Sequence, residues 1–396
     1  MHVRWFWLTC QQLYFETPFR LSIRVVAATG NLFSSVLINL PYLKPKFRNV
    51  SSPTLQSSCL VAYPTMSFPV LDASRFSSSS AALRNQHAHE LLMHLKQHGF
   101  VRLKNTGIPT QAIQDAFALG KRFFELPLEE KCKIMNPPGP SPQRGWSKLG
   151  AEKTSTLYGK LMGYAMPDDL TDAREHFDFG PSGDPLFPNR WPSPCTSPSF
   201  RSSLEALYTR CEAVSHDILT ALAEALELSP TTFVQHLSPN ASEFRINHYP
   251  AISDAELASS KVERIWPHFD LGVVTLLFAD GSGVGGLQFE DRVKGGFADV
   301  EAGEIGEVLV NVSETLQRWT GGELPAGLHR VTKPAGTEGQ VPERFTMAYF
   351  CKAARHAKVG VLPPFKKRAD SVVGMEAEEE DITALEYQQT RLLTAY

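Results

Sequence analysis

The tetrapeptide Pro267-His268-Phe269-Asp270 contains two side chains that can hold one metal ion together. In an extended segment alternate residues point to the same side, so His268 and Asp270 can approach one ion while Phe269 faces away. These two ligands alone leave a divalent ion under-coordinated, and His329, on a later expected strand, can supply a third. Two histidines and one carboxylate on one face of a metal, with the opposite positions open, are typical of non-haem iron(II) oxygenases.

This pattern also has a purely structural interpretation. With 12 histidines and 42 acidic residues, a chain of this composition can contain an HxD tripeptide by chance. A lone histidine on a strand is more often a hydrogen-bonded core residue than a ligand. The metal interpretation therefore depends on what else follows in the chain.

A guanidinium and a hydroxyl share one strand face in Arg344-Phe345-Thr346. A guanidinium aimed into a protein interior needs an anion to offset its desolvation, and a bound dicarboxylate would provide one. Two alternatives stay open, because Arg344 could pair with Glu343 or could lie exposed at a strand end.

Asn247 and Tyr249 share a face in the same way. The hydroxyl of Tyr249 could donate a hydrogen bond to a metal-bound carboxylate. The alternative is a core tyrosine whose hydroxyl is satisfied by the protein itself.

The elements that must position these residues fall into two regions. Before residue 200 the pattern predicts strands and helices in alternation, and after residue 242 it changes to short β-branched or aromatic runs between glycine-rich turns, which suggests a barrel or a double-sheet jelly roll. The expected strands of the first region are 68–72, 100–103 and 174–178, and its expected helices are 81–97, 110–124 and 128–134. A long helix is expected at 200–228, followed by strands at 244–249, 273–278, 287–290, 308–312, 328–331 and 345–350.

Composition limits the class of protein. The 396 residues are 42% hydrophobic and can bury a large core. The net charge of −3 is small and the basic residues are dispersed, so we expect no nucleic-acid partner, and a small-molecule substrate is the default. Six cysteines without a CxxC pair indicate a reducing compartment, and we expect the cytoplasm.

Residues 1–66 differ from the rest, because Glu16 is their only acidic residue against six lysines and arginines. We expect an irregular leader there. One alternative is a transit segment, which would make the protein mitochondrial. A membrane anchor is the other, but the apolar run from Val25 to Leu43 is interrupted by Gly30 and Pro41, among others, so we expect no stable membrane insertion.

The order of these motifs resembles the isopenicillin N synthase-like family of iron(II)- and 2-oxoglutarate-dependent dioxygenases, over about residues 68–396. Within that family the chain looks most like fungal thymine dioxygenase and secondary-metabolite oxygenases. The motifs that carry the resemblance are Asn-His-Tyr-Pro at 247–250, His268-x-Asp270, Leu276-Leu277-Phe278-x-Asp280, Gly285-Gly286-Leu287-Gln288, Gln317-Arg318-Trp319-Thr320, His329-Arg330-Val331 and Arg344-x-Thr346. Thr346 stands where the family usually has serine, a change that keeps the hydroxyl.

The resemblance implies a fold and a function. The fold would be mostly β with flanking helices, namely a double-stranded β-helix (jelly roll) core with an α/β N-terminal region. We expect a leader at 1–66, the N-terminal region at 67–200, the core at 201–365 and a helical tail at 366–396. The activity would be hydroxylation or desaturation of a small metabolite with dioxygen, with ascorbate in support.

The resemblance also implies roles for the site residues. His268, Asp270 and His329 would hold Fe(II), Arg344 and Thr346 would hold the far carboxylate of 2-oxoglutarate, and Tyr249 and Asn247 would steady its other end. Two alternatives stay open, an iron oxidase or cyclase that needs no 2-oxoglutarate and a non-catalytic jelly-roll homologue. The substrate and the oligomeric state are not predicted.

Overall fold

The computed structural model describes residues 14–17, 20–22, 65–66, 69–156, 170–195, 197–257, 259, 261–301, 303–366 and 382–393. The chain forms two compact units, Met1–Leu60 and Val61–Tyr396. In the first unit, β1 (Tyr14–Thr17) pairs antiparallel with β2 (Arg20–Ser22). The leader expected for residues 1–66 and the acidic segment 376–381 lie largely or wholly outside the described residues.

The second unit contains one large sheet of eight strands. All neighbouring strands in it are antiparallel except the first pair, β4 with β5. In spatial order the strands are β4 (Val70–Asp72), β5 (Phe100–Lys104), β16 (Val308–Val312), β13 (Val274–Ala279), β19 (Arg344–Cys351), β9 (Glu243–Tyr249), β8 (Glu175–Phe179) and β6 (Gly145–Ser147). Strands from both predicted regions, 67–200 and 201–365, thus share this sheet.

A second sheet of five strands completes the core. Its spatial order is β12 (Ile265–His268), β17 (His329–Val331), β14 (Leu287–Glu290), β15 (Phe297–Val300) and β3 (Thr65–Met66). Side chains of both sheets line one cavity between them. This arrangement confirms the predicted jelly-roll core with flanking helices, and the predicted strands match the observed ones to within two residues at each end.

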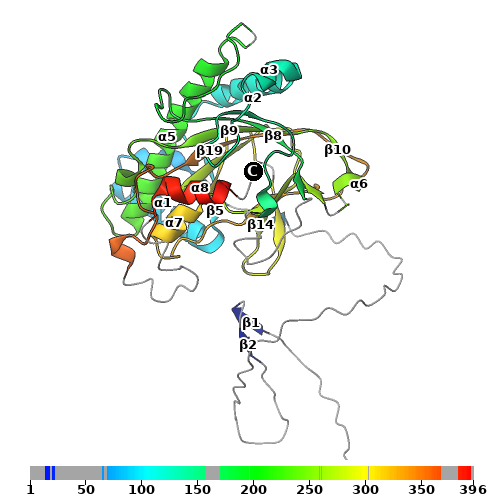
Figure 1. The fold of residues 1–396 in the computed structure, drawn as a ribbon. Coiled ribbons are helices and arrows are strands. Elements are labelled where there is room, and N and C mark those ends of the chain that lie inside the picture. Colours follow the sequence, from blue (N-terminus) through cyan, green and yellow to red (C-terminus); the bar gives the residue numbers. More distant parts are fainter. Residues whose placement is uncertain are drawn as a thin grey trace, which may run out of the picture. The chain divides into compact units, whose positions relative to one another are not determined.

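Helices cover the outer face of the large sheet (Figure 1). They are α1 (Ala81–His98), α2 (Thr110–Phe124), α3 (Leu128–Cys132) and α5 (Phe200–Ala225). Helix α1 begins where the Ser80 side chain accepts a hydrogen bond from the Leu83 amide. It ends at Gly99, whose φ of 74° lies in the left-handed region that favours glycine. Apolar side chains of α1, α2 and α5 join one hydrophobic core with the outer face of the sheet.

Strand β19 shows how the two faces of the large sheet differ. Phe345, Met347 and Tyr349 point outward into the core beneath the helices. The alternate residues Arg344, Thr346, Ala348 and Phe350 line the cavity. The side-chain period of two therefore separates an apolar outer face from a partly polar inner face. Phe278, a candidate from sequence for lining the barrel or filling the core, belongs to the outer core.

The remaining elements are short and connect or cover the sheets. They are η1 (Ala73–Ser77), β7 (Thr171–Asp172), η2 (Val234–Leu237), β10 (Ile252–Ser253), α6 (Asp254–Leu257), β11 (Val262–Glu263), α7 (Glu314–Trp319), β18 (Gln340–Val341), η3 (Pro363–Phe365) and α8 (Ala384–Leu392). Within the described part of the chain, no helix has the length and apolar character needed to cross a membrane.

Candidate metal and cosubstrate site

The pairing of β12 with β17 brings the two histidines together. His268 lies opposite His329 in the antiparallel register, and the centroids of their rings are 4.2 Å apart. Asp270 lies two residues beyond the end of β12, and its Oδ1 lies 3.8 Å from Nε2 of His268. One ligand atom from each of the three residues lies within 4.8 Å of the other two, which is close enough for all three to bind one ion.

Both imidazoles are oriented by backbone carbonyls. Nδ1 of His268 lies 2.9 Å from the carbonyl oxygen of Trp266, and Nδ1 of His329 lies 3.0 Å from that of Gly327. Since a carbonyl can only accept, Nδ1 donates in each ring and Nε2 keeps its lone pair for a metal. Burial lowers the pKa of His268 below its usual value, which favours the neutral form that a metal requires.

Two hydrogen bonds fix the orientation of the Asp270 carboxylate. Its Oδ2 accepts hydrogen bonds from the Thr275 hydroxyl at 2.7 Å and from the Asn311 side-chain amide at 2.9 Å. These bonds leave Oδ1 facing the histidines. Thr275 and Asn311 were not predicted as site residues, although both occupy cavity-lining positions of predicted strands. The donor set, with its supporting hydrogen bonds, fits a divalent metal.

The expected anion anchor points into the same cavity. Arg344 is only 6% exposed, and its Nη1 has no hydrogen-bond partner among the described residues. Glu343, the acidic partner considered for it, instead lies 2.9 Å from Nε2 of His248 on the other side of the strand. Thr346 is buried beside Arg344 and accepts a hydrogen bond from Asn247, so its own proton is available to a ligand.

A second buried cation lies close to the first. Arg264 is fully buried, and its only hydrogen bond among the described residues donates to the Pro342 carbonyl. The guanidinium of Arg344 lies 5.1 Å from the centroid of the Tyr249 ring, and that of Arg264 lies 5.9 Å from the same centroid. Burial and the charge of Arg344 lower the pKa of Arg264 to about 10. Neither guanidinium has a carboxylate partner in the described part of the chain. Arg344 lines the cavity and Arg264 does not, so it is the unpaired charge of Arg344 that suits this end of the cavity to an anion. No pattern in the sequence had indicated Arg264.

The cavity has a volume of about 110 Å³. One water molecule needs only ~10–15 Å³, so the space suits small organic molecules. Apolar side chains surround the end near Arg344, including Leu277, Leu287 and Leu309, whereas charged side chains line another part of the wall.

That charged part of the wall is a network the sequence analysis did not predict. The carboxylate of Glu152 accepts hydrogen bonds through Oε2 from both Arg174 and Arg245. Arg245 also donates to Asp178 at 2.7 Å, and Arg174 donates to Asn247 at 3.0 Å. The alternation Arg174, His176, Asp178 in a segment expected to be extended was the available signal, because it places polar side chains on one face.

Helix α8 covers one side of the cavity with Gln388 and Leu392. It begins with a capping box formed by Thr383 and Glu386. The Tyr387 hydroxyl donates to Glu314 of α7, and Arg391 lies 3.4 Å from the same carboxylate. Within the tail expected to be helical at 366–396, α8 is the helix that the described residues contain. It contributes to the cavity wall.

Comparisons with known proteins agree with this geometry. Residues 68–194 match the model of the non-haem dioxygenase in morphine synthesis N-terminal family, and residues 241–353 match that of the 2OG-Fe(II) oxygenase superfamily. The chain is 43% identical to the 2-oxoglutarate-dependent dioxygenase ucsF of Acremonium sp, covering 84% of this chain and 100% of that protein. It is 40% identical to the 2-oxoglutarate-dependent dioxygenase ecdK of Aspergillus rugulosus, with the same coverage.

Among solved structures, the chain is similar to a full-length Neurospora crassa protein crystallised in complex with alpha-KG. The TM-score is 0.69 at 26% identity, and the match covers 82% of this chain and 95% of the Neurospora crassa protein. A crystal structure of that protein with both alpha-KG and thymine gives the same TM-score and identity.

Proposed function

The chain belongs to the 2OG-Fe(II) oxygenase superfamily and is a 2-oxoglutarate-dependent dioxygenase, and from this premise we propose that His268, Asp270 and His329 hold its Fe(II). The observation that carries the proposal is the hydrogen bonding behind the ligands. Each imidazole donates through Nδ1 to a carbonyl, and Asp270 is fixed through Oδ2, so the three remaining ligand atoms face one point.

We propose that the cosubstrate lies between this metal and the buried guanidinium of Arg344. Arg344 pairs with the far carboxylate of 2-oxoglutarate, and Thr346 donates its hydroxyl proton to it. Tyr249 lies beside Arg344, so we place its hydroxyl at the far carboxylate of the cosubstrate. From the sequence, this hydroxyl was expected at the opposite end of the cosubstrate, next to the metal. Asn247 acts through its hydrogen bond to Thr346 and lines the cavity itself.

When bound, Fe(II) with 2-oxoglutarate and dioxygen supplies the oxidising power to hydroxylate or desaturate an unactivated C–H bond, with succinate and carbon dioxide as co-products. The protein's own residues bind and orient. The buried inner faces of the sheets exclude bulk water, and the arginine anchor fixes the cosubstrate in one direction. We place the substrate among small organic metabolites of secondary metabolism, which the fungal origin of the relatives supports.

The test compares two histidine variants of the full chain supplied with Fe(II), ascorbate and 2-oxoglutarate. His268→Ala should abolish both Fe(II) binding and succinate formation. His248→Ala, in which the removed imidazole lies outside the cavity beside Glu175 and Glu343, should retain both. Undiminished metal binding in His268→Ala would contradict the ligand assignment.

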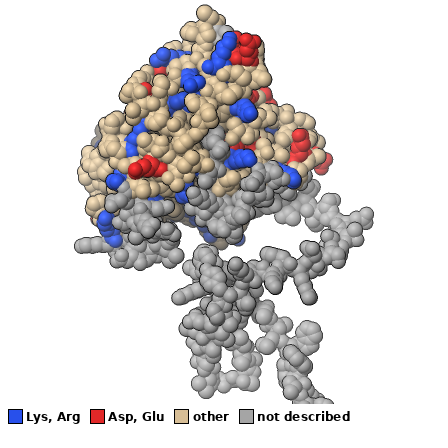
Figure 2. Space-filling view, viewed as in Figure 1, with Lys and Arg blue, Asp and Glu red and all other residues tan. Residues whose placement is uncertain are grey.

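We also propose that the enzyme acts in the cytoplasm on free small molecules, without a nucleic-acid partner. Figure 2 shows basic and acidic side chains interspersed on the viewed face. Mass spectrometry of the N-terminus of the natural protein would show whether residues 1–66 are part of the mature chain. A mature N-terminus near residue 66 would support the proposal that they are removed or never present. The division into regions ending at residues 200 and 365 stays a prediction.

A further inference from the structure

Apart from the proposed metal ligand Asp270, Glu152 is the carboxylate of the cavity wall that has one unused oxygen among the described residues. Arg174 and Arg245 both donate to Oε2, and Oε1 accepts no hydrogen bond in the described structure. Glu152 itself lines the cavity. By contrast, Glu243 is occupied at both oxygens, by Arg144 and Gln388 at one and by Lys352 at the other.

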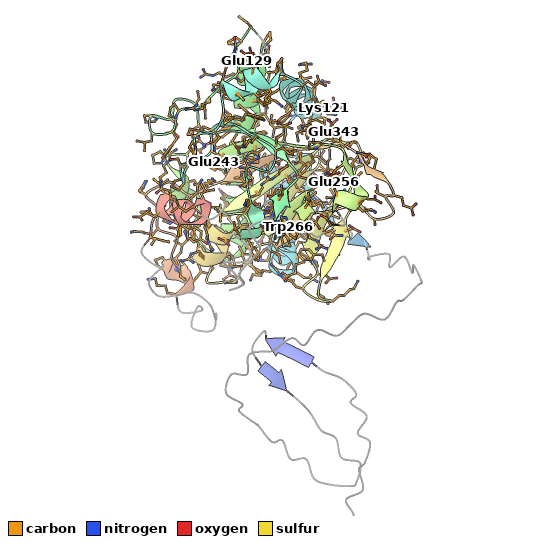
Figure 3. The ribbon with its side chains drawn as sticks, turned by 45° about the vertical axis from the view of Figure 1, so that its right-hand side comes forward. Lys121, Glu129, Glu243, Glu256, Trp266 and Glu343 are labelled. Carbon is orange, nitrogen blue, oxygen red and sulfur yellow. The ribbon has the colours of Figure 1, made fainter. Side chains whose placement is uncertain are left out.

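Glu152 also lies close to the metal centre. Thr154, two residues further along the chain, accepts a hydrogen bond at 3.1 Å from the backbone amide of Trp266, which is labelled in Figure 3. The carbonyl of Trp266 is the acceptor for Nδ1 of His268. The loop that carries Glu152 is therefore hydrogen-bonded to β12, the strand that carries His268. Glu152 and His268 line the same cavity.

The charge on Glu152 is permanent at physiological pH. Burial by itself would raise the pKa of this carboxyl, but the two arginines outweigh burial and hold the pKa well below its usual range. The same arginines keep the side chain in one place. The cavity wall thus presents a fixed anionic acceptor whose Oε1 has no donor among the described residues.

Building on the proposed function, we propose that Glu152 determines specificity by accepting a hydrogen bond from a nitrogen-bound proton of the substrate. The substrate class is then a small molecule with an amine or amide N–H group. This contact fixes one end of the molecule, so that a neighbouring C–H bond faces the metal. The apolar side chains of Leu271 and Phe350, which line the same cavity, suit the carbon skeleton.

The probes are two pairs of ring compounds that differ at the nitrogen. Piperidine, a cation at neutral pH, is compared with tetrahydropyran, and the neutral amide 2-piperidone is compared with N-methyl-2-piperidone. Binding is measured by saturation-transfer NMR on the full chain loaded with 2-oxoglutarate and Zn(II), which replaces Fe(II) because it is redox-inert. An N–H···carboxylate bond should make at least one N–H probe bind roughly tenfold more tightly than its partner.

Glu152→Gln should reduce that preference to about threefold or less, because the amide lacks the charge of the carboxylate. The matched control is Asp178→Asn, which removes the other carboxylate of Arg245 from a fully buried position that does not line the cavity. It should keep the wild-type preference. If Glu152→Gln does not fold, Glu152→Asp is used instead. Its side chain keeps the negative charge but is one methylene shorter, so the carboxylate lies further from the ligand and the N–H preference should also weaken.

Two results would overturn the inference: no N–H preference in the wild-type protein for either pair, or a preference that survives in Glu152→Gln. A preference only for piperidine identifies an ammonium substrate, and a preference for 2-piperidone as well identifies neutral N–H groups; both support the inference. Binding of 2-oxoglutarate is measured in the same samples. If it is absent, the proposed function fails; if it is present without an N–H preference, only the role of Glu152 fails.

Discussion

Replacing Arg344 by methionine separates a cosubstrate anchor from a structural ion pair. Arg344 is 6% exposed, and no carboxylate of the described residues pairs with its guanidinium. Removing one partner of a buried charge pair costs about 2–5 kcal/mol. Arg344→Met should therefore raise the dissociation constant of 2-oxoglutarate by about 30- to 4000-fold. Without the cosubstrate, its free energy of unfolding should stay equal or increase, because an uncompensated buried charge is lost.

Arg102→Met is the matched control. Arg102 is also buried, at 8% exposure, but it pairs with Glu307, whose side chain is 16% exposed. Breaking that pair should destabilise the protein by about 3 kcal/mol. Arg102 lines a second pocket together with Arg344 and Thr346, but its charge is already paired with Glu307, so the affinity for 2-oxoglutarate should fall far less than in Arg344→Met. Isothermal titration calorimetry with Mn(II) measures the binding, and urea unfolding of the apoprotein measures the stability. The reasoning is refuted if Arg344→Met destabilises the apoprotein as much as Arg102→Met does, or if it binds 2-oxoglutarate with wild-type affinity.

Three further predictions concern other parts of the site. Thr275→Val removes a hydrogen bond to Asp270 and should weaken Fe(II) binding by about 10- to 100-fold. Thr275→Ser keeps the hydroxyl and should bind Fe(II) as the wild type does. Equal affinities of the two variants in a metal titration would contradict this prediction. Burial raises the pKa of Asp172 to about 7, whereas an aspartate in the unfolded chain titrates near pH ~4. Between these two pH values the folded state binds a proton that the unfolded state has lost. The contribution of Asp172 to the free energy of unfolding therefore falls as the pH rises from about 4 to 7. The stability of Asp172→Asn relative to wild type, from urea unfolding at several pH values, should accordingly rise from about pH 4 to 7 and then level off; a flat difference would count against it. Tyr387→Phe removes a hydrogen bond to Glu314, so amide hydrogen exchange in α8 should accelerate roughly tenfold, and unchanged exchange would show that α8 is held by other contacts.

The sequence allowed the main elements and the central site residues to be predicted because both follow local rules. Ser80 and Gly99 delimit α1 by capping, and the period of two in β19 assigned Arg344 and Thr346 to one face. The same period placed His268 and Asp270 side by side. His329, on a later expected strand, was a candidate third ligand, and the resemblance to a family supported it. No local rule could show that it meets His268, because that depends on the pairing of β12 with β17.

Other parts of the site depend on contacts between distant strands. Thr275 and Asn311 lie opposite one another in the register of β13 and β16, and only that register brings both to Asp270. Glu152 lies in a loop without periodicity, so no pattern indicated that it would meet Arg174 and Arg245.

The sequence by itself determined which side of each strand is polar and which residue types could bind iron and an anion. The tertiary structure alone decided which of these side chains share a cavity, that Arg344 has no acidic partner among the described residues, and that Tyr249 lies beside it. The physical reason is that side-chain alternation is fixed by backbone geometry within a strand, whereas proximity between strands depends on register and on the packing of two sheets.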